Sequence, residues 1–122
     1  MEHLLIDGEH LTIKDLVDVA RNNRKIRLSE QAIARIKKSR EYVDDLVNKG
    51  AIVYGITTGF GKFSDVFISA EDTKALQRNL IVSHSCSLGN PLDEEVVRGT
   101  MLLRVNTLAK GFSGIRPETV NT

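Results

Sequence analysis

Helix-start signals recur along this chain and constrain what it can fold into. Thr12 and Ser69 are each followed three residues later by an aspartate, which is the pattern of a capping box. Ser29 stands before Glu30, and an acidic residue in the first turn is stabilised by the positive end of the helix dipole. Repeated signals of this kind predict a mainly α-helical protein.

Helix-end signals follow at spacings that suit short and medium helices. The pair Asn22-Asn23 ends the first segment, and Gly50 closes the second as a left-handed cap residue does. A fourth segment opens with acidic residues and stops at Gly111. We therefore expect helices over about 12–22, 29–49, 69–83 and 93–110.

The fourth segment is unusually apolar. Hydrophobic side chains between Val96 and Leu108 cover more than one face, so we expect this helix to be buried on most sides. A small domain cannot cover that much apolar surface, and we expect the chain to self-associate. Pro117 followed by Glu118 is typical of the start of a further helix, which indicates a sequence cut from a longer protein.

Strand signals are few and short. The apolar run 4–6 is followed by Asp7-Gly8, a strong hairpin signal, so we expect a strand, a tight turn and a return through residues 10–11. The run 51–53 is also strand-like, and the basic residues between 21 and 27 are interpreted as a solvated connector. The fold class that follows is mainly α, with one or two short β-strands or a hairpin.

The segment from Tyr54 to Gly61 has neither helical nor strand periodicity and holds three of the nine glycines. Clustered glycines mark a loop that turns tightly or approaches a ligand closely, and a phenol there is a candidate catalytic or binding group. The alternative is a surface loop with a packed tyrosine. Nucleotide binding is disfavoured, because Phe63 and Ser64 stand where the phosphate-binding patterns need other residues.

His84 is the second candidate site residue. Leu76, Leu80 and His84 are four residues apart, so they share one helix face, and we expect that face to point toward the core. A histidine there is usually a hydrogen-bonded core residue; the functional alternative is an imidazole that reads a substrate. The loop that follows contains Cys86 and small residues without a neighbouring base, so a nucleophile is unsupported.

The composition limits which partners the chain can bind and which cellular compartment it suits. The chain has 122 residues, 41% of them hydrophobic, and 17 basic residues balance 16 acidic ones. A net charge of +1 creates no strong field for nucleic acid or a membrane surface. One cysteine, no signal peptide and no long apolar run predict a soluble cytoplasmic protein without disulfides, and no metal site is expected.

Three ordered motifs resemble the aromatic amino acid ammonia-lyases. They are the loop Tyr54–Gly61, the segments Asn79–Ser85 and Gly89–Leu92, and the segments Arg104–Leu108 and Gly111–Pro117. The resemblance covers roughly the whole chain and is weakest before Ser29. It is nearest to family members that act on histidine, although members that act on tyrosine share much of it.

The resemblance implies the N-terminal part of the helical ammonia-lyase fold, which is fumarase/aspartase-like. It implies a single region with a strand-and-helix front end at about 1–63 and a helical part at about 64–122. The family eliminates ammonia, here from L-histidine to give urocanate, as a homotetramer. Its electrophile, 4-methylidene-imidazole-5-one, forms from an Ala-Ser-Gly tripeptide that does not occur in this sequence, so the fragment alone should be inactive.

The resemblance also assigns roles to individual residues. Tyr54 matches the catalytic tyrosine that removes a β-proton, and His84 matches the position that reads the substrate side chain. Thr57, Phe60 and Gly61 are expected to shape the site. A free phenol has a pKa near ~10, so phenolate chemistry needs positive charge or hydrogen-bond donors nearby. A tyrosine lyase or aminomutase and a non-catalytic helical module are the alternatives.

Overall fold

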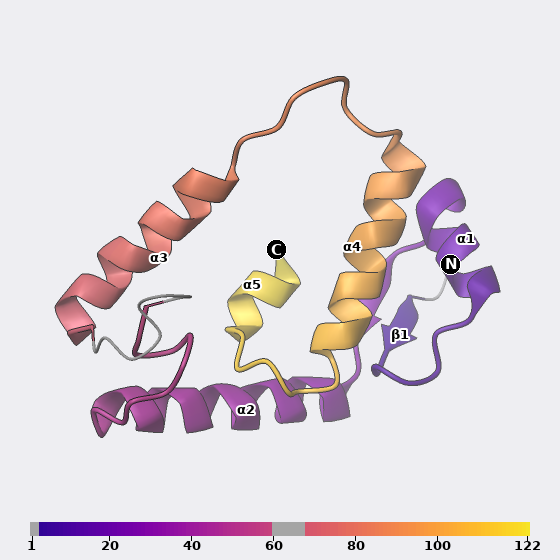
Figure 1. Ribbon diagram of the computed structural model, residues 1–122. Coiled ribbons are helices and arrows are strands. Elements are labelled where there is room, and N and C mark those ends of the chain that lie inside the picture. Colours follow the sequence, from indigo (N-terminus) through magenta and orange to yellow (C-terminus); the bar gives the residue numbers. More distant parts are fainter. Residues whose placement is uncertain (1–2, 60–67) are drawn as a thin grey trace. The chain divides into compact units, whose positions relative to one another are not determined.

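The described part of the protein consists of helices and two short strands (Figure 1). The computed structural model describes residues 3–59 and 68–122. The elements are β1 (Leu4–Ile6), α1 (Ile13–Asn22), β2 (Ile26–Leu28), α2 (Glu30–Asn48), α3 (Ala70–His84), α4 (Glu94–Leu108) and α5 (Pro117–Asn121). This architecture confirms the expected mainly α fold class.

The chain divides into two compact units. The first unit comprises residues 1–42 and 91–122, and the second comprises residues 43–90. Helix α2 begins in the first unit and ends in the second. In neither unit does a described helix combine the length and apolarity that crossing a bilayer requires.

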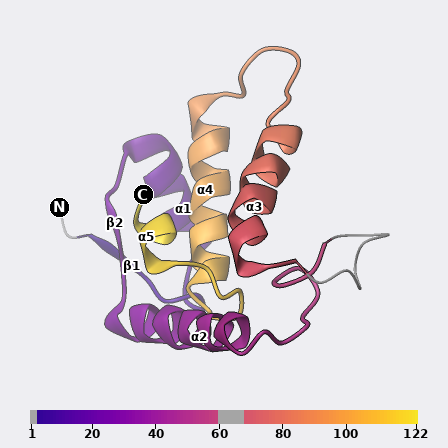
Figure 2. The same cartoon turned by 90° about the vertical axis from the view of Figure 1, so that its left-hand side faces the viewer.

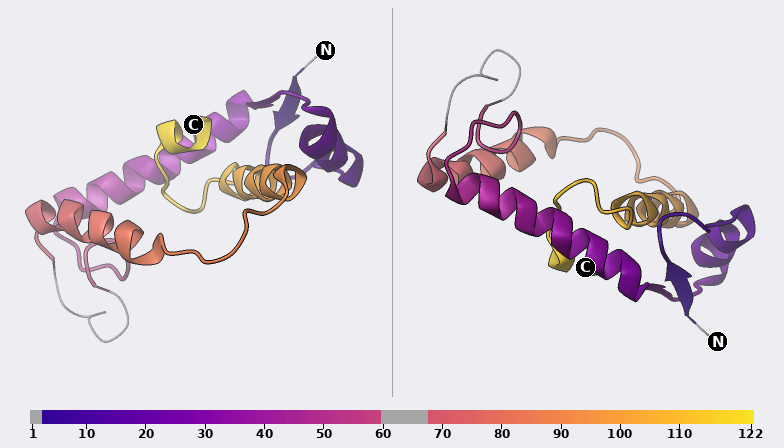
Figure 3. Two further views of the ribbon diagram at one scale, coloured as in Figure 1. Left: turned by 90° about the horizontal axis from the view of Figure 1, so that it is seen from above. Right: turned by 90° about the horizontal axis from the view of Figure 1, so that it is seen from below.

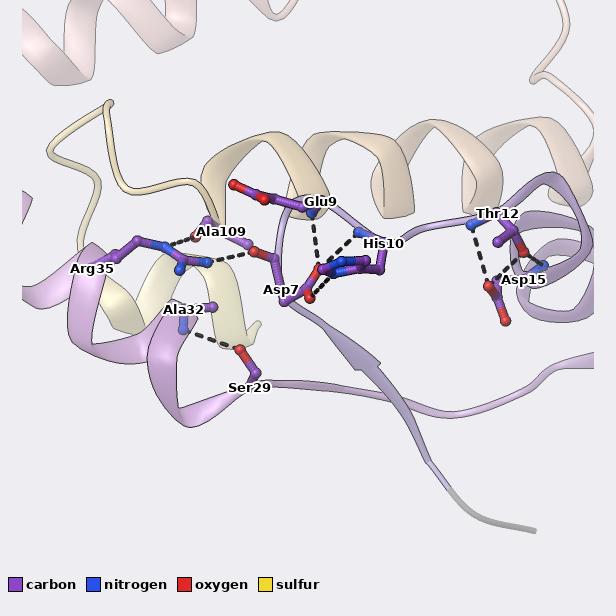
Figure 4. Close-up of polar contacts among 9 residues, drawn as sticks. All are labelled: Asp7, Glu9, His10, Thr12, Asp15, Ser29, Ala32, Arg35 and Ala109. Carbon is purple, nitrogen blue, oxygen red and sulfur yellow. Dashed lines mark hydrogen bonds and ion pairs between the residues drawn. The ribbon is translucent and has the colours of Figure 1, made fainter.

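The expected helix caps are present. The Thr12 hydroxyl accepts a hydrogen bond from the Asp15 N–H at 3.2 Å, and the Asp15 carboxylate accepts one from the Thr12 N–H (Figure 4). The Ser29 hydroxyl accepts the N–H of Ala32 at 3.1 Å, which starts α2. Ser69 caps α3 in the same way. Because each cap depends on residues three positions apart, the sequence alone was enough to place these helix starts.

The expected hairpin at Asp7-Gly8 is wrong. Strands β1 and β2 pair in parallel with Leu4 opposite Ile26, so helix α1 connects them. The Asp7 carboxylate instead accepts the N–H groups of Glu9 and His10 and turns the chain toward α1. The connector predicted at 21–27 therefore includes a strand, whereas the strand predicted at 51–53 is absent.

The core of the first unit lies between β1, β2, α1, α2 and α4. Helix α1 packs along α4 (Figure 2). The views from above and below show the same two helices side by side (Figure 3). The Arg98 guanidinium of α4 donates to the Val19 carbonyl of α1 at 2.9 Å. The buried apolar residues are Ile6, Val19, Leu28, Ala32, Ile36, Leu102, Leu108, Ala109 and Val120.

Helix α4 is less buried than its composition predicted. Only Leu102 and Leu108 are buried on it, whereas Val96 and Met101 are 46% and 60% exposed. Its apolar residues surround the helix, but the first unit packs against only part of that surface. The prediction that α4 carries more apolar surface than this chain covers is consistent with that exposure.

Arg35 connects three parts of the first unit. Its guanidinium donates to the carbonyl oxygen of Asp7, just after β1, and to that of Ala109, just after α4 (Figure 4). One turn further along α2, the Ser39 hydroxyl accepts the N–H of Gly114 at 2.9 Å. Helix α2 thus fixes the backbone of the segment that joins α4 to α5.

Candidate functional site

Tyr54 lies in the loop between α2 and α3, within the second unit. It begins a four-residue turn, and its side chain is 62% exposed. Gly55 follows with a φ of +73°, a conformation that favours glycine. The described part of the segment 54–61 is a loop, as expected, whereas the predicted site residues Phe60 and Gly61 lie outside the described residues.

Two buried threonines shape this loop from inside. The Thr57 hydroxyl accepts the Val53 N–H at 2.9 Å and donates to the carbonyl oxygen of Ala51. The Thr58 hydroxyl accepts the Gly55 N–H and donates to the Gly59 carbonyl oxygen. Thr57 and Thr58 are 4% and 1% exposed. Their hydroxyl groups hydrogen-bond to backbone groups of the loop, and Tyr54 in the same loop is exposed.

His84 is the last residue of α3, and its side chain is exposed. The prediction that it faces the core is wrong. No described side chain of α3 is buried, so none of the described residues of this helix forms an apolar layer that the imidazole could join. Helical spacing placed Leu76, Leu80 and His84 on one face, but spacing cannot show whether another element covers that face.

The His84 ring is held by its own helix. Its Nδ1 atom lies 2.9 Å from the Leu80 carbonyl oxygen and 3.0 Å from the Ser83 hydroxyl. The Ser83 hydroxyl donates to the same carbonyl at 2.9 Å. No role was predicted for Ser83 from the sequence. The available signal was a serine near a helix end, where it can bond back to a carbonyl three or four residues earlier.

Tyr54 and His84 do not meet within this chain. The Thr57 carbonyl accepts the N–H of Ile68, two residues before α3 begins, so the tyrosine loop lies at the start of that helix. His84 lies at its other end. Fifteen residues of helix span about 22 Å. The structure therefore places the two predicted site residues apart, and both residues are exposed.

Among residues 3–59 and 68–122, the remaining chemistry-bearing groups form no further site. Cys86 is free and exposed, and the described residues contain no group of three or more His, Cys, Asp or Glu side chains able to hold a metal ion. The Glu9 N–H and the His10 ring lower the pKa of Asp7, which in turn raises the pKa of His10. The Thr12 hydroxyl lowers the pKa of Asp15. These shifts belong to turns and caps of the first unit.

Known proteins resemble this chain in sequence and structure. The family model described as aromatic amino acid lyase matches residues 11–122. Histidine ammonia-lyase from Caldanaerobacter subterraneus subsp. tengcongensis is 65% identical over 122 residues, which is 100% of this chain and 24% of that protein. The chain therefore spans about a quarter of the length of the curated relatives it matches.

Two solved structures have nearly the same fold over 98% of this chain. Histidine ammonia-lyase from Trypanosoma cruzi superimposes with a TM-score of 0.88 at 41% identity, over 23% of its own length. The ergothioneine-degrading enzyme ergothionase from Treponema denticola superimposes with a TM-score of 0.92 at 32% identity, over 24% of its length.

Proposed function

Because this chain belongs to the aromatic amino acid lyase family, we propose that it forms part of an enzyme that eliminates ammonia from L-histidine to give urocanate. The observation that carries the proposal is the 65% identity, along the whole chain, with a histidine ammonia-lyase. An accessible phenol and an accessible imidazole, each on a hydrogen-bonded support, agree with it.

The proposed role of Tyr54 is that of a general base. A phenolate takes a proton from the substrate Cβ, the Cα–N bond breaks, and the amino group leaves as ammonia while a Cα=Cβ double bond forms. The hydroxyl groups of Thr57 and Thr58 hold the loop backbone, so the exposed phenol is presented from a fixed turn. General bases of this kind typically contribute 10²–10⁴-fold to the rate.

The proposed role of His84 is to recognise the substrate side chain. Its ring is anchored through Nδ1, and none of the described residues bonds the opposite nitrogen, Nε2. A ring presented in this way can exchange one hydrogen bond with an imidazole or with a phenol. The contact separates histidine and tyrosine from an amino acid with a purely apolar ring.

The family's electrophile is not made by the residues of this chain. The Ser-Gly pair at 113–114 follows Phe112 instead of an alanine. Gly114 is buried, its N–H is bonded to Ser39 and its carbonyl accepts from Arg40, so this segment is a structural turn. 4-Methylidene-imidazole-5-one would therefore come from residues outside this sequence. To this chain we assign only the general base, Tyr54, and the residue that recognises the substrate side chain, His84.

The proposal extends to the assembly and the compartment. We propose a cytoplasmic homotetramer for the complete enzyme. The exposed apolar residues on α4, namely Val96, Val97, Met101 and Leu103, support association between copies. The single, exposed cysteine suits a reducing compartment.

A chimera tests the activity and the substrate together. In it, residues 1–122 replace the matching segment of the Caldanaerobacter histidine ammonia-lyase, to which they are 65% identical. L-Histidine and L-tyrosine are supplied in turn, and the products are separated. Urocanate from L-histidine supports the proposal. Coumarate or β-tyrosine from L-tyrosine without any urocanate would replace it with the tyrosine enzyme, and no turnover of either would support a non-catalytic module.

A further inference from the structure

The hydrogen bonds at the end of α3 determine which nitrogen of His84 carries the proton. Nδ1 contacts two oxygen atoms of the described residues: the Leu80 carbonyl oxygen at 2.9 Å and the Ser83 hydroxyl oxygen at 3.0 Å. A carbonyl oxygen can only accept. An unprotonated Nδ1 would face the Leu80 oxygen with its own lone pair, which is repulsive.

The Ser83 hydroxyl does not reverse this conclusion. A hydroxyl can donate one hydrogen, and the Ser83 hydrogen is directed to the Leu80 carbonyl at 2.9 Å. The lone pairs of its oxygen then remain to accept from Nδ1. Both contacts of Nδ1 are therefore with acceptors, and the arrangement is satisfied only when Nδ1 carries a hydrogen.

We propose that Ser83 is a positioning residue that, with the Leu80 carbonyl, holds neutral His84 in the Nδ1–H tautomer and makes Nε2 a hydrogen-bond acceptor. This inference rests on the proposed function for its consequence: the substrate side chain must present a hydrogen-bond donor. An imidazole N–H or a phenol O–H satisfies Nε2, and an unsubstituted phenyl ring does not. The hydrogen bonds made by Nδ1 thus determine that Nε2 accepts a hydrogen bond and does not donate one.

Nuclear magnetic resonance of the 122-residue chain tests the tautomer without any need for activity. The three histidines are labelled with ¹⁵N, and the signals that disappear in His84→Gln identify the ring of interest. Long-range ¹H–¹⁵N spectra at about pH 8.5 report neutral imidazoles, because free histidine side chains titrate near ~6.5. We expect His84 to be mainly Nδ1–H. A mainly Nε2–H ring, as in unstructured peptides, would overturn the proposal.

Matched serine variants test the role of Ser83. Ser83→Ala removes one of the two acceptors and should lower the Nδ1–H population, whereas Ser83→Thr keeps the hydroxyl and should restore it. Ser85→Ala is the control, because the Ser85 hydroxyl bonds back to the carbonyl of Ile81 and not to His84. An unchanged tautomer population in Ser83→Ala, or an equal loss in Ser85→Ala, would refute the role of Ser83.

The chimera connects the tautomer to recognition. If only the Nδ1–H form binds substrate, Ser83→Ala should raise the KM for L-histidine by the ratio of the two Nδ1–H populations, with kcat changed far less. A KM that does not move while the population falls would refute the donor requirement. An inactive parent chimera would count against the proposed function, and the tautomer measurement would still stand.

Discussion

The Thr57 hydroxyl accepts the N–H of Val53, the residue immediately before Tyr54, at 2.9 Å. Thr57→Val has nearly the same shape but cannot make this bond or the one to the Ala51 carbonyl. Two backbone groups then lose their partner, and each unsatisfied group costs about 1–3 kcal/mol. We expect the Val53 amide to exchange with solvent roughly tenfold faster or more, as measured by hydrogen exchange.

Thr57→Ser is the control for this variant, because it retains the hydroxyl and should retain the protection of the Val53 amide. In the chimera, Thr57→Val should also lower kcat, since the turn that presents Tyr54 is loosened. Unchanged exchange at Val53 in Thr57→Val would show that the hydroxyl does not hold the loop.

Gly111 lies where α4 meets α2, and a side chain there has no room. A Cβ atom would lie 2.6 Å from the Arg35 Cβ and 2.9 Å from the Arg35 carbonyl oxygen, and the residue has a φ of +78°. We expect Gly111→Ala to lower the free energy of unfolding by about 1–3 kcal/mol, because both overpacking and a left-handed alanine are unfavourable. Urea unfolding followed by circular dichroism measures the change.

Gly99 in α4 provides the opposite expectation within the same unit. A Cβ atom there would lie 3.6 Å from the Leu16 Cδ1, an ordinary contact, and the backbone is helical. Gly99→Ala should be neutral or stabilising by up to ~1 kcal/mol, since alanine favours helix. If Gly111→Ala and Gly99→Ala unfolded at the same urea concentration, the close packing described at Gly111 would be contradicted.

The helices were predictable because their signals are local. The Thr12 cap and the Asn23 residue with a φ of 56° each depend on a few neighbouring residues, so the ends of α1 follow from the sequence. The β1–β2 pairing was missed because each strand has three residues and its partner lies beyond a helix. The turn signal at Asp7-Gly8 was real, but it leads into α1.

The candidate site was predictable only as residue types and motifs. The resemblance singled out Tyr54 and His84, and the structure shows both accessible. Burial of His84 was predicted wrongly, because helical spacing reveals a shared face but not the element that covers it. The link from Ser83 to Nδ1 required three-dimensional geometry, since its hydroxyl could have bonded to several groups.

His10 should make stability depend on pH above the ordinary pKa of histidine. The hydrogen bond that the His10 ring donates to the Asp7 carboxylate, followed by the negative charge of that carboxylate, raises the pKa of His10. The folded state thus favours protonated His10. This contribution to stability is complete below the unfolded pKa near ~6.5 and is lost as the pH rises through the raised folded pKa. His10→Gln should remove this decline in thermal stability, and His3→Gln should keep it.

Asp7 should make the protein less stable at low pH, whereas His10 makes it less stable at high pH. Its pKa is lowered, first by the Glu9 N–H and then by His10. Its contribution is present above the unfolded pKa near ~3.9 and is lost as the pH falls toward the lowered folded pKa. Asp7→Asn can still accept the hydrogen bonds of the turn, but the loss of stability at low pH should be smaller in this variant. A stability profile identical to that of the parent in Asp7→Asn would refute the pairing with His10.

The apolar surface of α4 should cause self-association of the 122-residue chain. Val97 and Met101 are 41% and 60% exposed, one turn apart. We expect the mass measured by light scattering to rise with protein concentration, and Val97→Lys with Met101→Lys to suppress this rise. Thr107→Lys, at an exposed polar position of the same helix, is the control. A monomer at all concentrations, with α4 strongly protected from hydrogen exchange, would contradict the prediction.

The most direct test of the account follows the ultraviolet absorbance of urocanate when L-histidine is added to the chimera and to its Tyr54→Phe variant. Tyr42→Phe is the matched control, since Tyr42 is the other tyrosine and is 65% exposed. We predict activity in the parent chimera, activity within about twofold of it in Tyr42→Phe, and a loss of about 10²–10⁴-fold in Tyr54→Phe. A Tyr54→Phe chimera that forms urocanate at the parent rate would contradict the assignment of Tyr54 as the base.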